Sequence, residues 1–107
     1  MNDGTPPAAI ERVEQDEVAV ARSAATAFCT HFGFPADQIG RLDGPPLIGP
    51  VSLEREGRFA TAYRWLGGGR GSYYVQVEVY RDTHQVVVYG GSSHREFGPW
   101  EFHGQSG

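Results

Sequence analysis

The stretch SYYVQVEVYRDTHQVVVYGG, residues 72–91, decides the fold of this 107-residue chain. Apolar and polar residues alternate along it, are interrupted by RDTH at positions 81–84, and then alternate again. Such alternation is typical of strands with one buried face, and a short polar break between two of them is typical of a hairpin. The stretch therefore predicts antiparallel strands over residues 73–80 and 86–89, with Asp82 and Thr83 in the turn.

The two faces of this hairpin differ in chemistry. The aliphatic face of the first strand carries Tyr73, Val75, Val77 and Val79. The opposite face carries Tyr74, Gln76, Glu78 and Tyr80. A single helix covers only one face of a sheet, so we expect the tyrosine-bearing face to stay open. An open face with aromatic and charged residues is a candidate binding surface, although tyrosine is also common in strands for its β-propensity alone.

A single helix is predicted before the sheet. Its apolar stripe at helical spacing consists of Val18, Ala21, Ala25, Phe28 and Phe32. Asp16 is a candidate N-cap, and Thr5, before Pro6, is an earlier candidate. We expect the firm helix to begin near residue 16 and residues 8–15 to form a separate turn or an exposed extension. Gly33 and Pro35 predict its end.

Two more strands are predicted between the helix and the hairpin. Residues 35–50 are rich in Pro and Gly and form a connector, followed by strands over residues 51–54 and 58–66. Gly57 supplies the turn between them. The stretch 92–107 is either a fifth short strand or a tail that packs on the sheet. We therefore predict one α+β domain over residues 1–107, with an N-terminal helix on a curled four-stranded antiparallel sheet (αββββ) and with residues 1–7 and 104–107 flexible.

Charge and composition exclude several classes of protein. Nine Arg, no Lys and 13 acidic residues give a formal net charge of −4, which argues against nucleic-acid binding. The exclusive use of Arg is typical of a GC-rich bacterial genome. No apolar run approaches the roughly 18 residues of a membrane span, and the N-terminus lacks signal-peptide features, so we expect a cytoplasmic protein with no membrane contact. Cys29 is the only cysteine and reads as a buried, inert thiol.

Catalytic and cofactor motifs are not found in the sequence. The run GGGRG at positions 67–71 lacks the Lys-Ser/Thr ending of a phosphate-binding loop, and the four histidines do not have metal-ligand spacing. We therefore expect no cofactor, no metal and no catalytic residues. The alternative is a small cone-shaped ligand-binding or enzymatic domain in which Glu17, Tyr63 and His31 supply acid–base groups.

The segment YYVQVEVYRDTHQVVVYGG resembles the last hairpin of PepSY-like domains and of nuclear transport factor 2-fold immunity proteins from bacterial polymorphic toxin systems. In those families a strand runs into a D-x-T-G-type turn, where this chain has His84. The helix AVARSAATAFCTHFG and the strand FATAY resemble the same immunity proteins, so that the similarity covers roughly residues 17–91. Cystatins share the architecture, although the Q-x-V-x-G motif of their inhibitory loop is missing.

The resemblance implies a non-enzymatic immunity protein that neutralises a cognate protein toxin by occluding its active site. The acidic chain suggests that this toxin is basic. The expected partner-binding residues are Trp65, Arg70, Tyr74, Glu78, Tyr80, Tyr89 and Trp100. The alternative is a structural or regulatory module that self-associates through its sheet as a homodimer.

Overall fold

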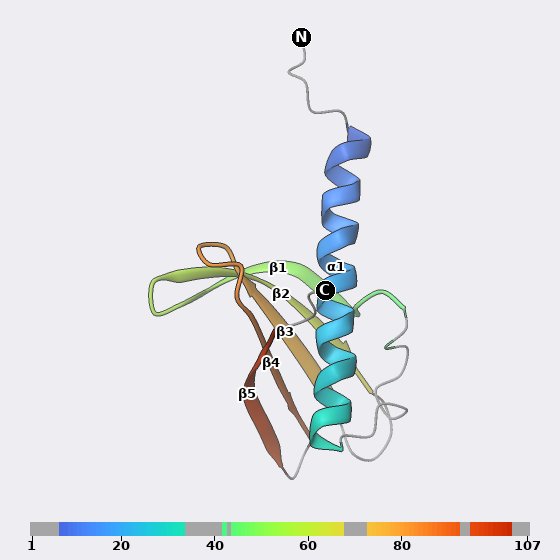
Figure 1. Cartoon of the computed structure of the whole chain (residues 1–107), viewed down its shortest axis with the longest axis vertical. Coiled ribbons are helices and arrows are strands. Elements are labelled where there is room, and N and C mark those ends of the chain that lie inside the picture. The colour runs from blue at the N-terminus through green and yellow to red at the C-terminus, as the bar shows by residue number, and fades with distance from the viewer. Residues whose placement is uncertain (1–6, 34–41, 43, 68–72, 93–94, 104–107) are drawn as a thin grey trace.

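The structure is a computed structural model that describes residues 7–33, 42, 44–67, 73–92 and 95–103. One helix packs on one antiparallel sheet, which confirms the α+β class (Figure 1). In chain order the elements are α1 (Pro7–Phe32), β1 (Ile48–Arg55), β2 (Arg58–Leu66), β3 (Tyr74–Tyr80), β4 (Val86–Gly91) and β5 (Glu96–Phe102). The strands lie side by side in the order β1-β2-β3-β4-β5.

The sheet has five strands, so the prediction of four is wrong. The stretch after β4 forms β5, which pairs antiparallel with β4 through Val88 and Trp100 among others. A register shift between Val88 and Gly90 leaves Gly98 and Pro99 without partners on β4. This bulge breaks the alternation of apolar residues in the sequence. The sequence pattern therefore does not distinguish a fifth strand from an irregular tail that packs on the sheet.

Helix α1 is continuous from Pro7, so the predicted start near residue 16 is also wrong. Residues 8–15 are mostly Ala, Glu, Gln and Arg, which favour helix, and proline is well placed at a first helical position. The helix packs against β3, β4 and β5, and its N-terminal part extends beyond the sheet (Figure 1). The predicted end is confirmed, because Gly33 follows the last helical turn with φ of 65°.

The core lies between α1 and the valine face of the sheet. Ala21, Ala24 and Ala25 are completely buried, and their small side chains let the helix approach the strands. Gly90 on β4 makes the approach possible for Phe28, because a Cβ at this position would lie 2.4 Å from Cε1 of the Phe28 ring. The predicted valine core is therefore confirmed, and it is completed by Tyr63 and Trp65 from β2.

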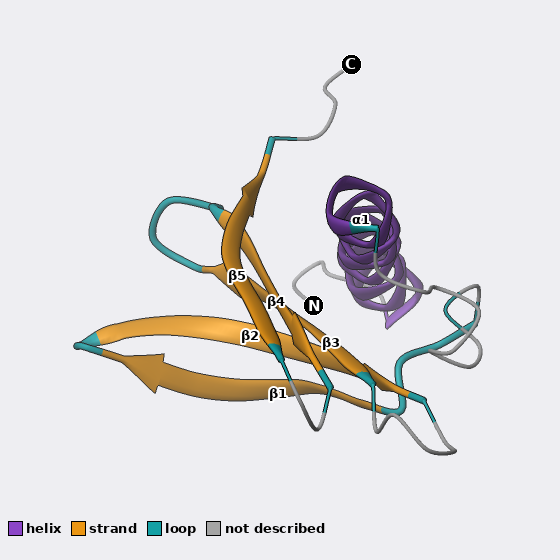
Figure 2. Ribbon diagram, turned by 90° about the horizontal axis from the view of Figure 1, so that it is seen from below, coloured by secondary structure: helices purple, strands orange, loops and turns teal. Residues whose placement is uncertain are grey.

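The opposite face of the sheet has no helix over it among the described residues (Figure 2). The register places alternate residues of all the central strands on this open face, so that Arg64 lies beside Gln76 and Gln76 beside Tyr89. A second, smaller cluster of buried residues forms here from Ala60, Tyr80 and Val87. The open face is thus partly apolar beneath its polar side chains.

The two edge strands share one feature. In β1, Gly49 and Pro50 have no partners on β2, and in β5 Gly98 and Pro99 have none on β4. Each Gly-Pro pair lies in a bulge, where the strand bends and the proline offers no N–H group to an incoming strand. Both edges of the sheet are therefore poorly suited to pairing with another chain.

Candidate functional site

The structure divides the seven predicted contact residues between the two faces of the sheet. Tyr74, Glu78, Tyr80 and Tyr89 lie together on the open face of β3 and β4. Trp65 and Trp100 lie on the face that α1 covers. Arg70 lies outside the described residues.

The prediction that Trp65 belongs to the binding surface is wrong, because this residue lies in the core. It pairs with Val75 of β3, so it shares the valine face, and its side chain is only 1% exposed. Its indole Nε1 donates a hydrogen bond to the backbone oxygen of Gly44, at 3.1 Å. The alternation of residues in 58–66 places Trp65 on the same face as Tyr63 and opposite Arg64, so the sequence itself carries the signal for the covered face.

The prediction that Trp100 belongs to the binding surface is also wrong, because Trp100 packs against α1. Its ring stacks on His31 of α1, with centroids 5.0 Å apart and an angle of 20° between the ring planes. It also meets Phe28 edge-on, at 6.1 Å. Trp100 therefore closes the side of the core between α1 and β5.

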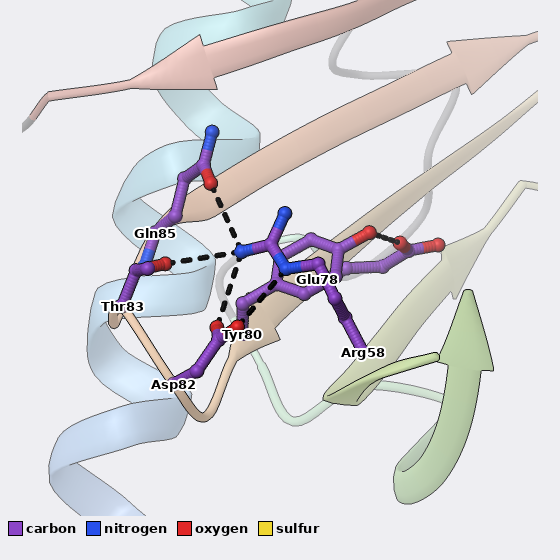
Figure 3. Close-up of polar contacts among 6 residues, drawn as sticks. All are labelled: Arg58, Glu78, Tyr80, Asp82, Thr83 and Gln85. Atoms are coloured by element: carbon purple, nitrogen blue, oxygen red, sulfur yellow. Dashed lines mark hydrogen bonds and ion pairs between the residues drawn. The ribbon is translucent and has the colours of Figure 1, made fainter. Parts of the chain in front are cut away.

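Glu78 lies at the centre of the open face and is completely buried. Arg55 reaches it from β1, and its Nε and Nη2 donate to the two carboxylate oxygens, each at 2.7 Å. The amide of Gln76 donates to Oε2 at 2.8 Å. The hydroxyl of Tyr80 donates to Oε1 at 3.2 Å, as Figure 3 shows. The buried carboxylate thus has three hydrogen-bonding neighbours, as a buried charge requires.

These contacts set the charge of Glu78. Burial by itself raises the pKa of the carboxyl group, but the hydrogen bonds from Arg55, Gln76 and Tyr80 and the charge of Arg55 outweigh it, so that the pKa of Glu78 lies below its usual value. Burial, and then the nearby Glu78 charge, raise the pKa of Tyr80. Glu78 is therefore an anion and Tyr80 a neutral donor at neutral pH.

Three arginines complete the open face, and the sequence prediction missed all three. Each guanidinium lies over a tyrosine ring: Arg55 over Tyr89 at 5.0 Å, Arg58 over Tyr80 at 4.2 Å, and Arg64 over Tyr74 at 4.7 Å. The alternation in 58–66 could have found Arg58 and Arg64, because it places both opposite Trp65. Arg55 lies just outside the strand predicted over residues 51–54, and it is the last residue of β1.

Arg58 is held where β2 begins, beside the β3–β4 turn. Its Nε and Nη2 donate to the two oxygens of Asp82, each at 3.1 Å, and Nη2 also donates to Thr83 and Gln85 (Figure 3). The hydrogen bond from Arg58 lowers the pKa of Asp82. A shallow hollow of about 340 Å³ lies beside it, lined by Arg58, Tyr80, Gln85, Val87, Tyr89, Pro99 and Glu101.

The residues of the alternative acid–base site are only partly together. The hydroxyl of Tyr63 donates to a carboxylate oxygen of Glu17, beside a hollow of about 330 Å³ that Arg81 and Ser52 also line. His31 lies fourteen residues further along α1, about 21 Å at roughly 1.5 Å per residue, and stacks on Trp100 instead. His31 is therefore separated from the Glu17–Tyr63 pair.

The described residues offer neither a metal site nor a reactive thiol. Within the described part of the chain, no three His, Cys, Asp or Glu side chains are grouped so that they could hold a metal ion. Cys29 is buried in the core, and burial raises the pKa of its thiol to about 11. Its thiol is therefore un-ionised at neutral pH and is a poor nucleophile.

Comparison with known proteins gives no match to a family model, to a curated protein or to a solved structure. Within the residues described, none of the helical structure has the length and apolar character needed to cross a membrane.

Proposed function

We propose that this chain is a non-enzymatic protein-binding domain, and that it acts as an immunity protein that occludes the active site of a cognate bacterial toxin. The observation that supports this function is the set of Arg–Tyr stacks on the open face, with no element covering them among the described residues. Tyr and Arg are the residue types that, with Trp, dominate the binding energy of protein interfaces.

The open face is also organised before any partner arrives. A continuous chain of hydrogen bonds links Arg64 to Gln76, Gln76 to Glu78 and Glu78 to Arg55. Long side chains normally lose conformational entropy when an interface forms, at a cost of about 0.5–1.5 kcal/mol each. Side chains that are already fixed avoid part of that cost, which favours binding.

The edges of the sheet favour this proposal over self-association. A homodimer formed by adding strand to strand needs a regular edge with free N–H groups, and both edges carry a Gly-Pro bulge. A partner that binds the face of the sheet needs neither edge. We therefore propose a monomer that forms a 1:1 complex with its toxin.

Affinity capture followed by reconstitution tests this function. The tagged chain is expressed in its source cells, proteins that co-purify are identified, and the recovered candidate is expressed with and without the chain. We expect a 1:1 complex by light scattering and rescue of growth when the candidate is toxic.

Tyr74→Ala and Tyr89→Ala should weaken the complex by about 2 kcal/mol, or roughly 30-fold in Kd. Thr26→Ala, on an exposed part of α1, is the control and should bind normally. Capture of no partner, or a growth effect that the chain does not relieve, would contradict the proposal.

A further inference from the structure

Arg64 differs from the other two arginines of the open face. Arg55 and Arg58 each form a two-point ion pair, with Glu78 and Asp82 respectively. Arg64 has no carboxylate within ion-pair distance among the residues that the structure describes. Its Nε donates to Gln76 at 2.8 Å and its guanidinium lies over Tyr74. Arg64 is therefore held in place while its two η nitrogens make no hydrogen bond to any described residue.

Exposed apolar residues lie where β1 begins, and their backbone is adjacent to Arg64 of β2. Ile48 pairs directly with Arg64 across β1 and β2, and it is 43% exposed. Leu47, whose backbone N–H donates to the Arg64 oxygen, is 68% exposed. Together with Val51 these are three of the five large apolar residues that are exposed in the described chain. We refer to Leu47, Ile48, Arg64 and Tyr74 as the Arg64 patch.

We propose that the Arg64 patch binds an Asp or Glu side chain of the protein partner, flanked by apolar residues of the same partner segment. This inference rests on the proposed function and names the chemistry of the partner. A planar guanidinium whose two η nitrogens are not engaged matches the two oxygens of a carboxylate, and charge-assisted bonds of this geometry are among the strongest in interfaces. Leu47 and Ile48 supply the apolar contact that excludes water around such a pair.

The proposal changes the expected character of the partner. The net charge of −4 suggested a basic toxin, but the contact surface presents a fixed cation that forms no ion pair with any acidic residue in the described part of the chain. The charge of the patch, rather than that of the whole chain, decides which side chain can be placed against it. The partner's contacting segment is therefore acidic and apolar.

Selection from a displayed library of random 12-residue peptides tests the inference. The whole chain is immobilised as wild type, as Arg64→Gln, as Arg64→Lys and as Arg81→Gln. Arg81 is the matched control, because it is an exposed arginine outside the open-face network that donates only to Ser52. Circular dichroism and thermal unfolding establish that each variant is folded.

We expect wild type to enrich peptides that carry Asp or Glu next to Leu, Ile, Val or Phe. Retention of these peptides should fall about tenfold or more in Arg64→Gln, which has lost the two-point contact, and should be unchanged in Arg81→Gln. Arg64→Lys keeps the charge without the planar fork and should retain them at an intermediate level. Amide chemical shifts of Ile48 and Tyr74 should change when a selected peptide is added.

Several results would overturn the inference. These are the absence of acidic peptides from the selected set, equal retention by wild type and Arg64→Gln, and a dimer of the chain that dissociates in Arg64→Gln, which would make a second copy the occupant. A toxin that binds wild type and Arg64→Gln equally would overturn it while the proposed function stands. Acidic peptides that bind through Arg64, in a chain that captures no toxin, would support the site and leave the immunity role without support.

Discussion

Arg55 and Glu78 form an ion pair across an intervening strand. Arg55 lies at the end of β1 and Glu78 lies on β3, so the arginine side chain crosses the open face of β2 to reach the carboxylate at 2.7 Å. Ala60 and Ala62, which β2 contributes to this face, are small and buried. Arg55 therefore covers the centre of the open face and also neutralises a carboxylate that is completely buried.

Removal of either partner should destabilise the fold to different extents. Arg55→Ala leaves the Glu78 anion buried without its main partner, and we expect a loss of about 2 kcal/mol. This is below the 3–5 kcal/mol of a fully buried pair because the Arg55 side chain is 45% exposed. Glu78→Gln leaves an exposed arginine, which water can solvate, and should cost less. Urea unfolding of each variant measures both values.

The double variant Arg55→Met with Glu78→Met is the control for this pair. It removes both charges and retains apolar volume, so its stability should return to within about 1 kcal/mol of wild type. The single variants Arg55→Met and Glu78→Met complete this cycle. A double variant that loses the sum of their two losses would show that the residues act independently, and the pair as described would be wrong.

Stability should fall in acid because of Glu78. Its pKa in the folded protein is below the ordinary value of 4.5, so the unfolded chain binds a proton more readily than the folded chain. The stabilisation is complete above the unfolded pKa and is lost as the pH falls through the lowered pKa of the folded state. The difference in unfolding free energy between wild type and Glu78→Gln should therefore shrink below about pH 4.5.

A difference in unfolding free energy that is constant between pH 7 and pH 3 would contradict this assignment. The pKa of Asp82 is also lowered in the folded protein, so Asp82 contributes to the loss of stability in acid in the same direction. The variant Asp82→Asn measures this contribution separately.

Gly90 should not tolerate any larger residue. The Cβ of Gly90→Ala would lie 2.4 Å from Cε1 of Phe28, whose ring is completely buried between α1 and the sheet. We expect a loss of about 1–3 kcal/mol, the usual range for overpacking a core. Phe28→Leu removes the ring, so the double variant should lose less than the sum of the single losses. Strict additivity in denaturant unfolding would show that the helix does not press on β4 at this point.

The β1–β2 hairpin should be stabilised by Glu56→Asn. Glu56 and Gly57 have φ of 52° and 81°, which is the type I′ turn for which Asn-Gly is the preferred sequence. A residue such as Glu is strained in this region, so the substitution should add about 0.5–1 kcal/mol to the free energy of unfolding. Glu56→Gln isolates the effect of charge and should change stability little, whereas Glu56→Val should destabilise. A stabilisation by Gln equal to that by Asn would assign the effect to charge instead of the backbone.

Much of this fold could be predicted from local sequence patterns. Alternation gave the β2 strand over 58–66 and the valine face of β3 because one buried face imposes a period of two. His84, the residue that stands where the resembling families have Gly, does adopt a positive φ of 61°. β5 could not be separated from a packed tail because the bulge at Gly98 and Pro99 interrupts its period.

The candidate site was harder to predict because its contacts cross strands. Nothing local in the sequence indicates that Arg55 reaches Glu78, 23 positions later, or that Arg64 stacks on Tyr74. These contacts depend on strand register, which is known only once the pairing is known. Trp65 differs from the expectation for another reason: tryptophan is a residue type favoured in interfaces, but the position of Trp65 in the alternation of residues 58–66 places it in the core.

The Gly-Pro bulges should keep the chain from associating through its edges. Replacement of Pro50 and Pro99 by Thr restores a backbone N–H group and a residue that favours strands on both edges. We expect this double variant to form oligomers at concentrations on the order of 100 μM, where the wild-type chain stays monomeric in light scattering. Pro45→Thr changes an exposed proline outside the sheet and is the matched control, expected to remain monomeric. A wild-type dimer under these conditions, or a folded double variant that is still a monomer, would show that the bulges do not protect the edges, and self-association through the sheet would then become the better account of this domain.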